Sequence, residues 1–131
     1  MTRVAHCRCG QLSATCVGEP ARVSVCHCHG CRRLTGGAFS AQARFPAEAV
    51  TITGESHVWE RVGDSGRRAW FHWCPDCGGT VMFVNEGYEH MPAIPLGAFA
   101  DDNAPEPTLS IFEETKRPWL AITGEGTEHH A

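Results

Sequence analysis

The sequence predicts a single domain of mostly β structure, and three observations support this. The 131 residues include 14 glycines and 8 prolines, which divide the chain into short segments. Almost no stretch places apolar residues at helical spacing over ten or more positions. Several segments instead alternate between apolar and polar residues, which is the period of a strand with one buried face. We expect one domain over residues 1–131, with the tail from about residue 124 outside its core.

The predicted strands are short apolar segments bounded by turn residues. They are expected over residues 11–17, 39–45, 50–53, 58–61, 68–73, 80–84, 94–98 and 108–112. Two of them alternate most clearly, and the residues expected on one face are Leu12, Ala14 and Cys16 in the first strand and Phe39, Ala41, Ala43 and Phe45 in the second. These two faces are therefore candidates for the core.

Helical structure is expected only as one turn over residues 29–34, which Gly36 and Gly37 would end. Residues 53–55 and 63–66 have the composition of turns, and residues 101–107 that of a surface loop.

The charge distribution argues against nucleic acid as a partner. The formal net charge is −4, and the 11 Lys and Arg residues are scattered apart from three adjacent pairs. The first six residues lack the apolar stretch of a signal peptide, and no later segment is long enough to span a bilayer. We therefore expect a soluble, cytoplasmic protein with no membrane partner.

The cysteines are the most informative residues. Seven of the eight fall into three clusters, which are Cys7-Arg8-Cys9, Cys26-His27-Cys28-His29-Gly30-Cys31 and Cys74-Pro75-Asp76-Cys77. In a reducing compartment, clustered cysteines are more often metal ligands than disulfides. Disulfides remain an alternative, although C-x-C pairs are poorly placed to bridge each other and the middle cluster would leave one cysteine over. Four sulfurs complete a structural zinc site and three leave a position open, so the spacing suggests two zincs per chain.

The first and third clusters together can supply a closed site. A β-sheet can bring Cys7 and Cys9 next to Cys74 and Cys77 despite their separation in sequence, and the segment 74–79 resembles a zinc-ribbon knuckle, in which proline and glycine shape the turn. The alternative is two unrelated pairs of reduced cysteines.

The middle cluster supplies three sulfurs, Cys26, Cys28 and Cys31, in what we interpret as a loop leading into the helical turn. His27, His29 or Cys16 could supply a fourth ligand. We favour an open site, because adjacent residues such as Cys26 and His27 rarely ligate one metal and catalytic zincs keep three protein ligands. Cys16 is interpreted as a buried apolar residue, with an approach to the three sulfurs as the alternative.

Taken together, these motifs resemble the glutathione-dependent formaldehyde-activating family, also called the centromere-protein-V-like family. The resemblance depends on an ordered set of segments, Cys7-Arg8-Cys9-Gly10, residues 26–33 followed by Gly36-Gly37-Ala38-Phe39, residues 71–78, and residues 116–120. It implies an Mss4-like β-tent with zinc knuckles, a structural zinc on Cys7, Cys9, Cys74 and Cys77, and a catalytic zinc on Cys26, Cys28 and Cys31. It also implies a carbon–sulfur lyase that condenses formaldehyde with glutathione to S-(hydroxymethyl)glutathione.

The residues are consistent with such an enzyme. Three thiolates make a zinc site of charge about −1, which suits an incoming thiol better than water. Glutathione carries two carboxylates, for which Arg32 and Arg33 are the nearest cations and Lys116 and Arg117 weaker candidates. Trp119 could form a wall of the pocket. We therefore expect a zinc-dependent lyase acting on glutathione or another small thiol and an aldehyde. The alternative is a non-catalytic zinc-binding module that recruits a protein partner. The oligomeric state is left open.

Overall fold

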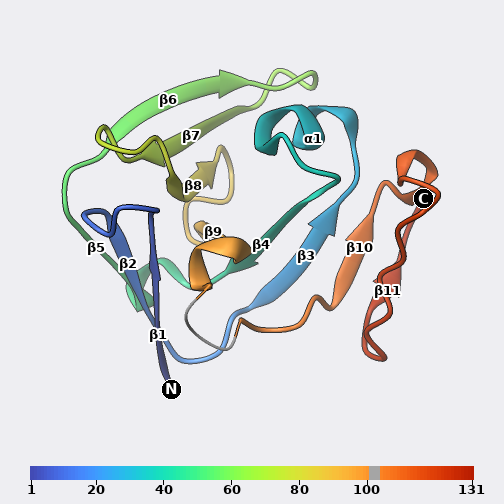
Figure 1. Cartoon of the computed structure of the whole chain (residues 1–131), viewed down its shortest axis with the longest axis horizontal. Coiled ribbons are helices and arrows are strands. Elements are labelled where there is room, and N and C mark those ends of the chain that lie inside the picture. Colours follow the sequence, from blue (N-terminus) through green and yellow to red (C-terminus); the bar gives the residue numbers. More distant parts are fainter. Residues whose placement is uncertain (101–103) are drawn as a thin grey trace.

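The computed structural model describes residues 1–100 and 104–131, and strands dominate these residues (Figure 1). The strands are β1 (Thr2–His6), β2 (Ser13–Val17), β3 (Arg22–Cys26), β4 (Ser40–Arg44), β5 (Val50–Thr53), β6 (His57–Val62), β7 (Arg68–Trp73), β8 (Thr80–Asn85), β9 (Ala93–Pro95), β10 (Leu109–Ile111) and β11 (Glu128–His129). Helical elements are α1 (His29–Thr35) and the 3-10 turns η1 (Ala47–Ala49), η2 (Leu96–Phe99) and η3 (Glu113–Thr115). The prediction of a mostly β domain is confirmed.

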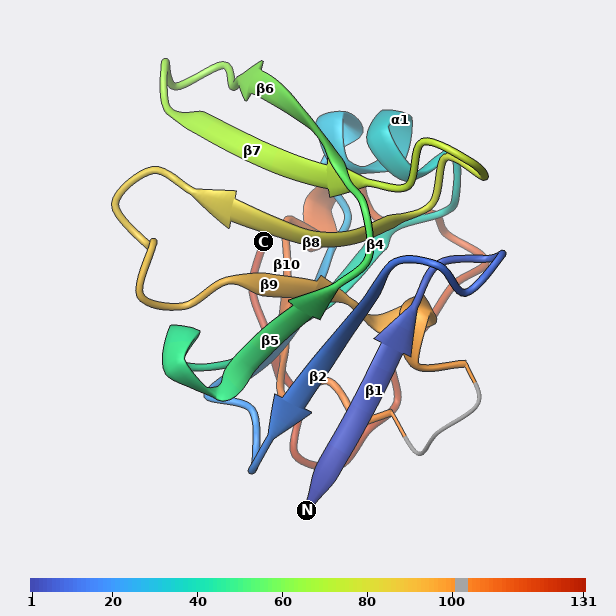
Figure 2. The same ribbon diagram turned by 90° about the vertical axis from the view of Figure 1, so that its left-hand side faces the viewer.

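The strands form two sheets. The smaller sheet has the order β1-β2-β5 and is antiparallel, and it faces the viewer in Figure 2. The larger sheet has the order β11-β10-β3-β4-β9-β8-β7-β6. Among the strands of the described residues, β10 alone pairs in parallel, with β3 on one side and β11 on the other. In Figure 1 the larger sheet bends from β10 and β3 round to the β6–β7 hairpin, near which α1 lies.

The core lies between the two sheets. Leu12, Ala14 and Cys16 are fully buried, so the predicted inward face of β2 is confirmed. The larger sheet contributes residues from several strands, chiefly Val23, Ala43, Val81 and Ile94, and Phe45 and Phe99 pack alongside them with ring centroids 6.3 Å apart. Burying each large apolar side chain contributes about 1.5–3 kcal/mol, so this shared core holds the sheets together.

Several element predictions are confirmed and others are wrong. Strands β5 and β7 have the predicted bounds, and α1 ends where Gly36 takes a left-handed φ of 72° and donates its N–H to the Arg32 carbonyl at 2.8 Å. The strand expected over 94–98 is wrong, because β9 ends at Pro95 and a 3-10 turn follows. The interpretation of Cys26 as part of a loop is also wrong, because Cys26 is the last residue of β3.

Strands β1, β3 and β11 were not predicted. All three strands are short, and β3 and β11 pair with strands that are distant in sequence. The local sequence pattern therefore gives little indication of these strands. The exposed strand β11 lies at the edge of the larger sheet. The loop expected over 101–107 includes residues 101–103, which lie outside the described residues. Within the described part of the chain, no helix is both long and apolar enough to cross a membrane.

Candidate functional site

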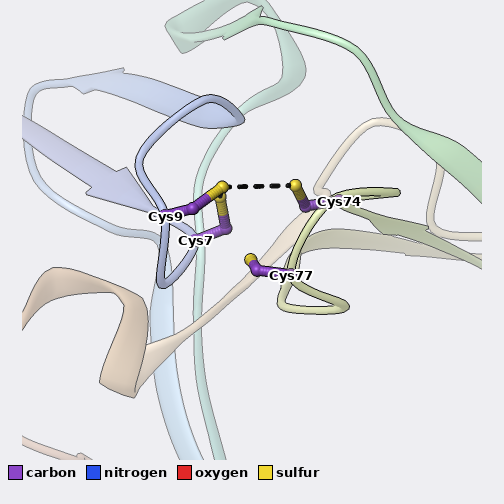
Figure 3. Close-up of side chains that lie close together, drawn as sticks. All are labelled: Cys7, Cys9, Cys74 and Cys77. Atoms are coloured by element: carbon purple, nitrogen blue, oxygen red, sulfur yellow. Dashed lines mark hydrogen bonds between the residues drawn. The ribbon is translucent and has the colours of Figure 1, made fainter.

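Two turns bring four cysteines together. Cys7 and Cys9 lie in the turn after β1, and Cys74 and Cys77 lie in the turn between β7 and β8 (Figure 3). The sulfur of Cys9 is 3.7 Å from the sulfurs of both Cys7 and Cys74. All four sulfur atoms lie within 4.8 Å of one another. Residues separated by 65 positions thus form one cluster, which we call the four-cysteine cluster.

The four-cysteine cluster fits a zinc ion. Tetrahedral coordination with Zn–S bonds of about 2.3 Å places sulfur atoms about 3.8 Å apart, close to the two 3.7 Å separations. All eight cysteines of the chain are free thiols, so the disulfide alternative does not hold in this structure. The four sulfurs of this cluster therefore suit a closed tetrahedral metal site.

Hydrogen bonds to sulfur support this cluster. The backbone N–H of Leu12 donates to Cys7 Sγ at 3.4 Å, and that of Asp76 donates to Cys74 Sγ at 3.3 Å. The Gln11 side-chain amide donates to Cys74 Sγ at 3.0 Å and also exchanges two hydrogen bonds with the backbone of Glu55. Donors of this kind stabilise thiolate and orient it toward a metal. Gln11 therefore connects the cluster to the segment before β6.

Glycine allows the two turns to approach each other. A Cβ on Gly79 would lie 3.2 Å from the Cβ of Cys7, which is tighter than ordinary contact. Gly78 has a φ of 81°, in the left-handed region, and its N–H donates to the Cys74 carbonyl at 2.8 Å. A hydrogen bond from the backbone N–H of Cys9 lowers the pKa of Cys77 to about 6. The turns therefore favour a thiolate at this position.

A second group of three sulfurs forms around the start of α1, and we call it the cysteine trio. Cys26 ends β3, Cys28 is the N-cap of α1, and Cys31 lies in the first turn of that helix. Their sulfurs lie within 4.8 Å of one another, and the Cys31 N–H donates to Cys28 Sγ at 3.3 Å. A hydrogen bond between two of the sulfurs lowers the pKa of Cys31 to about 5 and raises that of Cys26. The trio fits a metal bound by three thiolates.

The candidates for a fourth ligand lie elsewhere. In residues 1–100 and 104–131, no histidine nitrogen, carboxylate oxygen or further sulfur lies within 4.8 Å of all three sulfurs. His27 is fully buried, and its Nε2 is hydrogen-bonded to Ser110 Oγ at 2.9 Å. His29 lines a surface cavity, and Cys16 is in the core between the sheets. The trio is thus a three-sulfur donor set in this part of the chain.

Comparison with known families agrees with this geometry. The family model described as glutathione-dependent formaldehyde-activating enzyme matches residues 2–115. The chain belongs to this formaldehyde-activating family. No curated protein gives a significant match. The matched range contains both cysteine clusters, so this member of the family has two sites whose donor atoms suit zinc.

In this formaldehyde-activating family member, a cationic cavity of about 270 Å³ lies on α1. Its lining residues are His29, Arg32, Arg33, Gly36, Gly37 and Arg117. Both arginines singled out from the sequence are therefore present, and Arg117, the weaker candidate, joins them from the segment after η3. Trp119 is 73% exposed and is not among the lining residues. Its role in substrate binding stays a prediction.

An apolar cavity of about 290 Å³ lies between the end of α1 and strands β7 and β8. Leu34 and Thr35 line it from the helix, and Phe71 and Phe83 line it from the sheet, with stacked rings 4.9 Å apart. Such a surface can exclude water beside the helix that bears Cys28 and Cys31.

Some site residues were missed by sequence reasoning. Gln11 donates to Cys74 of the four-cysteine cluster, and Ser110 contacts His27, which lies between Cys26 and Cys28 in sequence; neither residue has a local motif that indicates this role. His27 could have been singled out further, because a histidine between two candidate ligands needs a hydrogen-bond partner when it is buried.

Proposed function

We propose that this protein is a zinc-dependent carbon–sulfur lyase that forms or cleaves S-(hydroxymethyl)glutathione or a related small thiol adduct. The observation that carries the proposal is the cysteine trio, which has three sulfurs and no fourth donor among the described residues. Catalytic zinc sites keep three protein ligands and leave one position for an exogenous group. The free state of all eight cysteines is consistent with a reducing compartment, and we propose the cytoplasm.

In this proposal Cys26, Cys28 and Cys31 hold a zinc ion, which when bound would favour the thiolate form of an incoming thiol. Cys7, Cys9, Cys74 and Cys77 hold a second zinc with a structural role, so that the chain has two zincs. The position of the trio supports this division, because His29 and Arg32, the direct neighbours of Cys28 and Cys31, line the cationic cavity, whereas the four-cysteine cluster joins two turns of different sheets.

The cationic cavity supports glutathione as the thiol. Arg32, Arg33 and Arg117 line it, and each guanidinium can bind a carboxylate through two parallel hydrogen bonds. Arg32 follows Cys31 directly, so a carboxylate bound there would lie close to the trio. We assign one glutathione carboxylate to this cavity. The apolar cavity lined by Phe71 and Phe83 would exclude water from the aldehyde.

The reaction balances without an oxidant or a reductant. In the forward direction the thiol sulfur forms a bond to the carbonyl carbon of formaldehyde and the carbon–oxygen π bond breaks. The thiol proton is released to solvent, and the oxygen takes up one proton from solvent. The reverse direction breaks the carbon–sulfur bond and regenerates the thiol and the aldehyde. The role of the chain is to bind and orient the two reactants.

Exchange spectroscopy by NMR tests the proposal, because glutathione and formaldehyde also combine without a catalyst. The exchange rate between free glutathione and its hydroxymethyl adduct is measured with and without the zinc-loaded protein. We expect acceleration above the uncatalysed rate, loss of that acceleration in Cys28→Ser, and retention in Cys16→Ala, which removes a thiol outside both clusters. A wild-type rate equal to the background would refute the lyase and leave the non-catalytic module.

X-ray absorption at the zinc edge provides a second test. The spectra are recorded for the wild-type protein with two zincs and for Cys28→Ser. Cys77→Ser is not used, because we expect it to unfold. We expect the average sulfur coordination number to rise when glutathione is added to the wild type and to stay constant in the variant. Four protein ligands on each zinc, with no change on adding glutathione, would contradict the proposal.

A further inference from the structure

A second arginine-rich cavity, separate from the cationic cavity on α1, lies at the other end of the larger sheet. Its volume is about 250 Å³. Five arginines line it together with polar and glycine residues, and the set is Arg22, Arg44, Arg61, Arg67, Arg68, Gly63, Ser65, Asn85, Glu86 and Tyr88. Arg22 lies on β3, Arg44 on β4 and Arg61 on β6, whereas Arg67 lies in the turn before β7 and Arg68 begins β7, so the fold gathers the arginines from distant parts of the sequence. We call this the sheet-end cavity.

The Arg44 side chain is held in place at the wall of the sheet-end cavity. Its side chain is 7% exposed, and it donates to the Met91 carbonyl at 3.0 Å and to Asn85 Oδ1 at 2.8 Å. Its guanidinium carbon lies 5.8 Å from the ring centroid of Phe83. All these partners are neutral, and the buried Nε atom has no hydrogen-bond partner among residues 1–100 and 104–131. A buried guanidinium held only by neutral groups keeps its charge uncompensated.

The surrounding charges add to this imbalance. In the described residues, Glu86 is the one carboxylate that lines the cavity, and Arg68 is the one arginine of the five with a carboxylate within ion-pair distance, that of Glu60 at 3.8 Å. Arg22 is paired directly across from Arg44 on the neighbouring strand. Burial, followed by the charge of Arg22, lowers the pKa of Arg44. A bound anion would relieve this repulsion.

The sheet-end cavity is distinct from the cysteine trio. Cys26 and Arg22 lie four residues apart on β3, on the same face, which corresponds to about 13 Å. Polar side chains occupy the face between them, because Gln42 donates to Ser24 Oγ at 3.1 Å and Ser40 donates to Gln42 Oε1 at 3.3 Å. A ligand in this cavity would therefore be recognised by arginines and not by sulfur.

We propose that the sheet-end cavity binds the oxyanion group of a small molecule, a phosphate or a carboxylate. Planar guanidinium groups bind both groups through paired, charge-assisted hydrogen bonds. Arg44 provides a pre-oriented positive charge at the wall of the cavity. The exposed side chains of Arg22 and Arg67 would contact the anion from the solvent side. This function is independent of the proposed lyase activity.

NMR titration of the zinc-loaded protein tests the proposal. Inorganic phosphate is added at constant ionic strength, adjusted with chloride, so that general screening stays fixed. We expect saturable shifts of the Gly63, Ser65 and Arg67 backbone amides, with small changes at Gly36 and Gly37 of the cavity on α1. Shifts that do not saturate, or that are confined to Gly36 and Gly37, would overturn it.

Matched variants locate the binding site. Arg22→Gln combined with Arg67→Gln changes two exposed side chains, so the fold should survive, and we expect phosphate affinity to fall by about tenfold or more. Arg33→Gln, on α1, should leave unchanged the affinity that is measured at the Gly63, Ser65 and Arg67 amides of the sheet-end cavity. Equal affinities in the wild type and the double variant would contradict the proposal. Methyl phosphate and acetate are titrated in parallel, and the tighter of the two identifies the group that the site prefers.

Discussion

Ser110 Oγ lies 2.9 Å from His27 Nε2, although the two residues are 83 positions apart. Both side chains are fully buried. The contact arises because β10 pairs in parallel with β3 and places Ser110 opposite Val25, two residues before His27. A second hydrogen bond joins the same two segments, because the Thr115 hydroxyl donates to the His27 carbonyl at 2.9 Å. The segment that carries the cysteine trio is thus fixed by the C-terminal part of the chain.

We expect Ser110→Ala to destabilise the protein by about 1–3 kcal/mol, because it leaves a buried imidazole nitrogen without a partner. Urea denaturation of the zinc-loaded protein measures this change. The control is Ser13→Ala on β2, a half-buried serine whose side chain has no hydrogen bond among those described. A free energy of unfolding that is equal in the two variants would show that the contact contributes nothing to stability.

The two cysteine clusters should differ in their effect on folding. Cys77→Ser breaks the cluster that joins two turns, and structural zinc contributes about 10–16 kcal/mol of binding energy in small zinc-dependent peptides, so we expect the cooperative thermal transition to be lost. Cys28→Ser should leave a folded protein with one zinc. Circular dichroism and metal analysis on both variants check this. Equal unfolding in both would refute a division between structural and catalytic zinc.

Gly54→Ala should be more damaging than Gly66→Ala, although both glycines have a positive φ. Left-handed backbone costs an alanine about 1–2 kcal/mol at either position. At Gly54 the new Cβ would also overlap the Gln11 carbonyl oxygen, 1.9 Å away, whereas at Gly66 no atom of the described residues lies within 4 Å of it. We expect this overlap to add about 1–3 kcal/mol.

Because Gln11 donates to Cys74 Sγ, Gly54→Ala should also weaken zinc binding at the four-cysteine cluster. Denaturant unfolding and competition with a chelator measure the two effects. Identical results for Gly54→Ala and Gly66→Ala would exclude a role for the contact with Gln11.

The attachment of the C-terminal strand should depend on pH through Glu113. Hydrogen bonds from Ser110 and His129 lower the pKa of this carboxyl. A lowered pKa in the folded state means that the ionised form contributes stability at pH values above the unfolded pKa, about 4.3, and that this contribution is lost as the pH falls through the folded pKa. We therefore expect Glu113→Gln to reduce protection of the β11 amides at pH 6 and to have a smaller effect at pH 3, which is below the unfolded pKa.

Amide hydrogen exchange measures this protection. The reporters are Glu128 in β11, whose N–H donates to the Thr108 carbonyl at 2.9 Å, and His130 directly after β11, whose N–H donates to the Ser110 carbonyl at 2.9 Å. Glu125→Gln is the control, because Glu125 is an exposed residue of the same tail. A difference between Glu113→Gln and the wild type that stays constant from pH 6 to pH 3 would exclude the titration of Glu113 as its cause.

The sequence alone determined the β class, the helical turn ended by Gly36, and the division of seven cysteines into groups of four and three. These features depend on local spacing. For example, residues three positions apart, such as Cys28 and Cys31, lie close together at a helical turn in any tertiary context. The family resemblance added the expected reaction of glutathione with formaldehyde, and the family itself is confirmed.

Only the tertiary structure decided which distant residues meet. The pairing of β10 with β3 brings Ser110 to His27, the approach of two turns brings Gln11 to Cys74, and the order of the larger sheet brings Arg22, Arg44 and Arg67 to one cavity. Contacts of this kind depend on strand order and register, which a short strand does not encode by itself. A β-rich domain with mostly long-range contacts therefore builds much of its site from residues that carry no local signal.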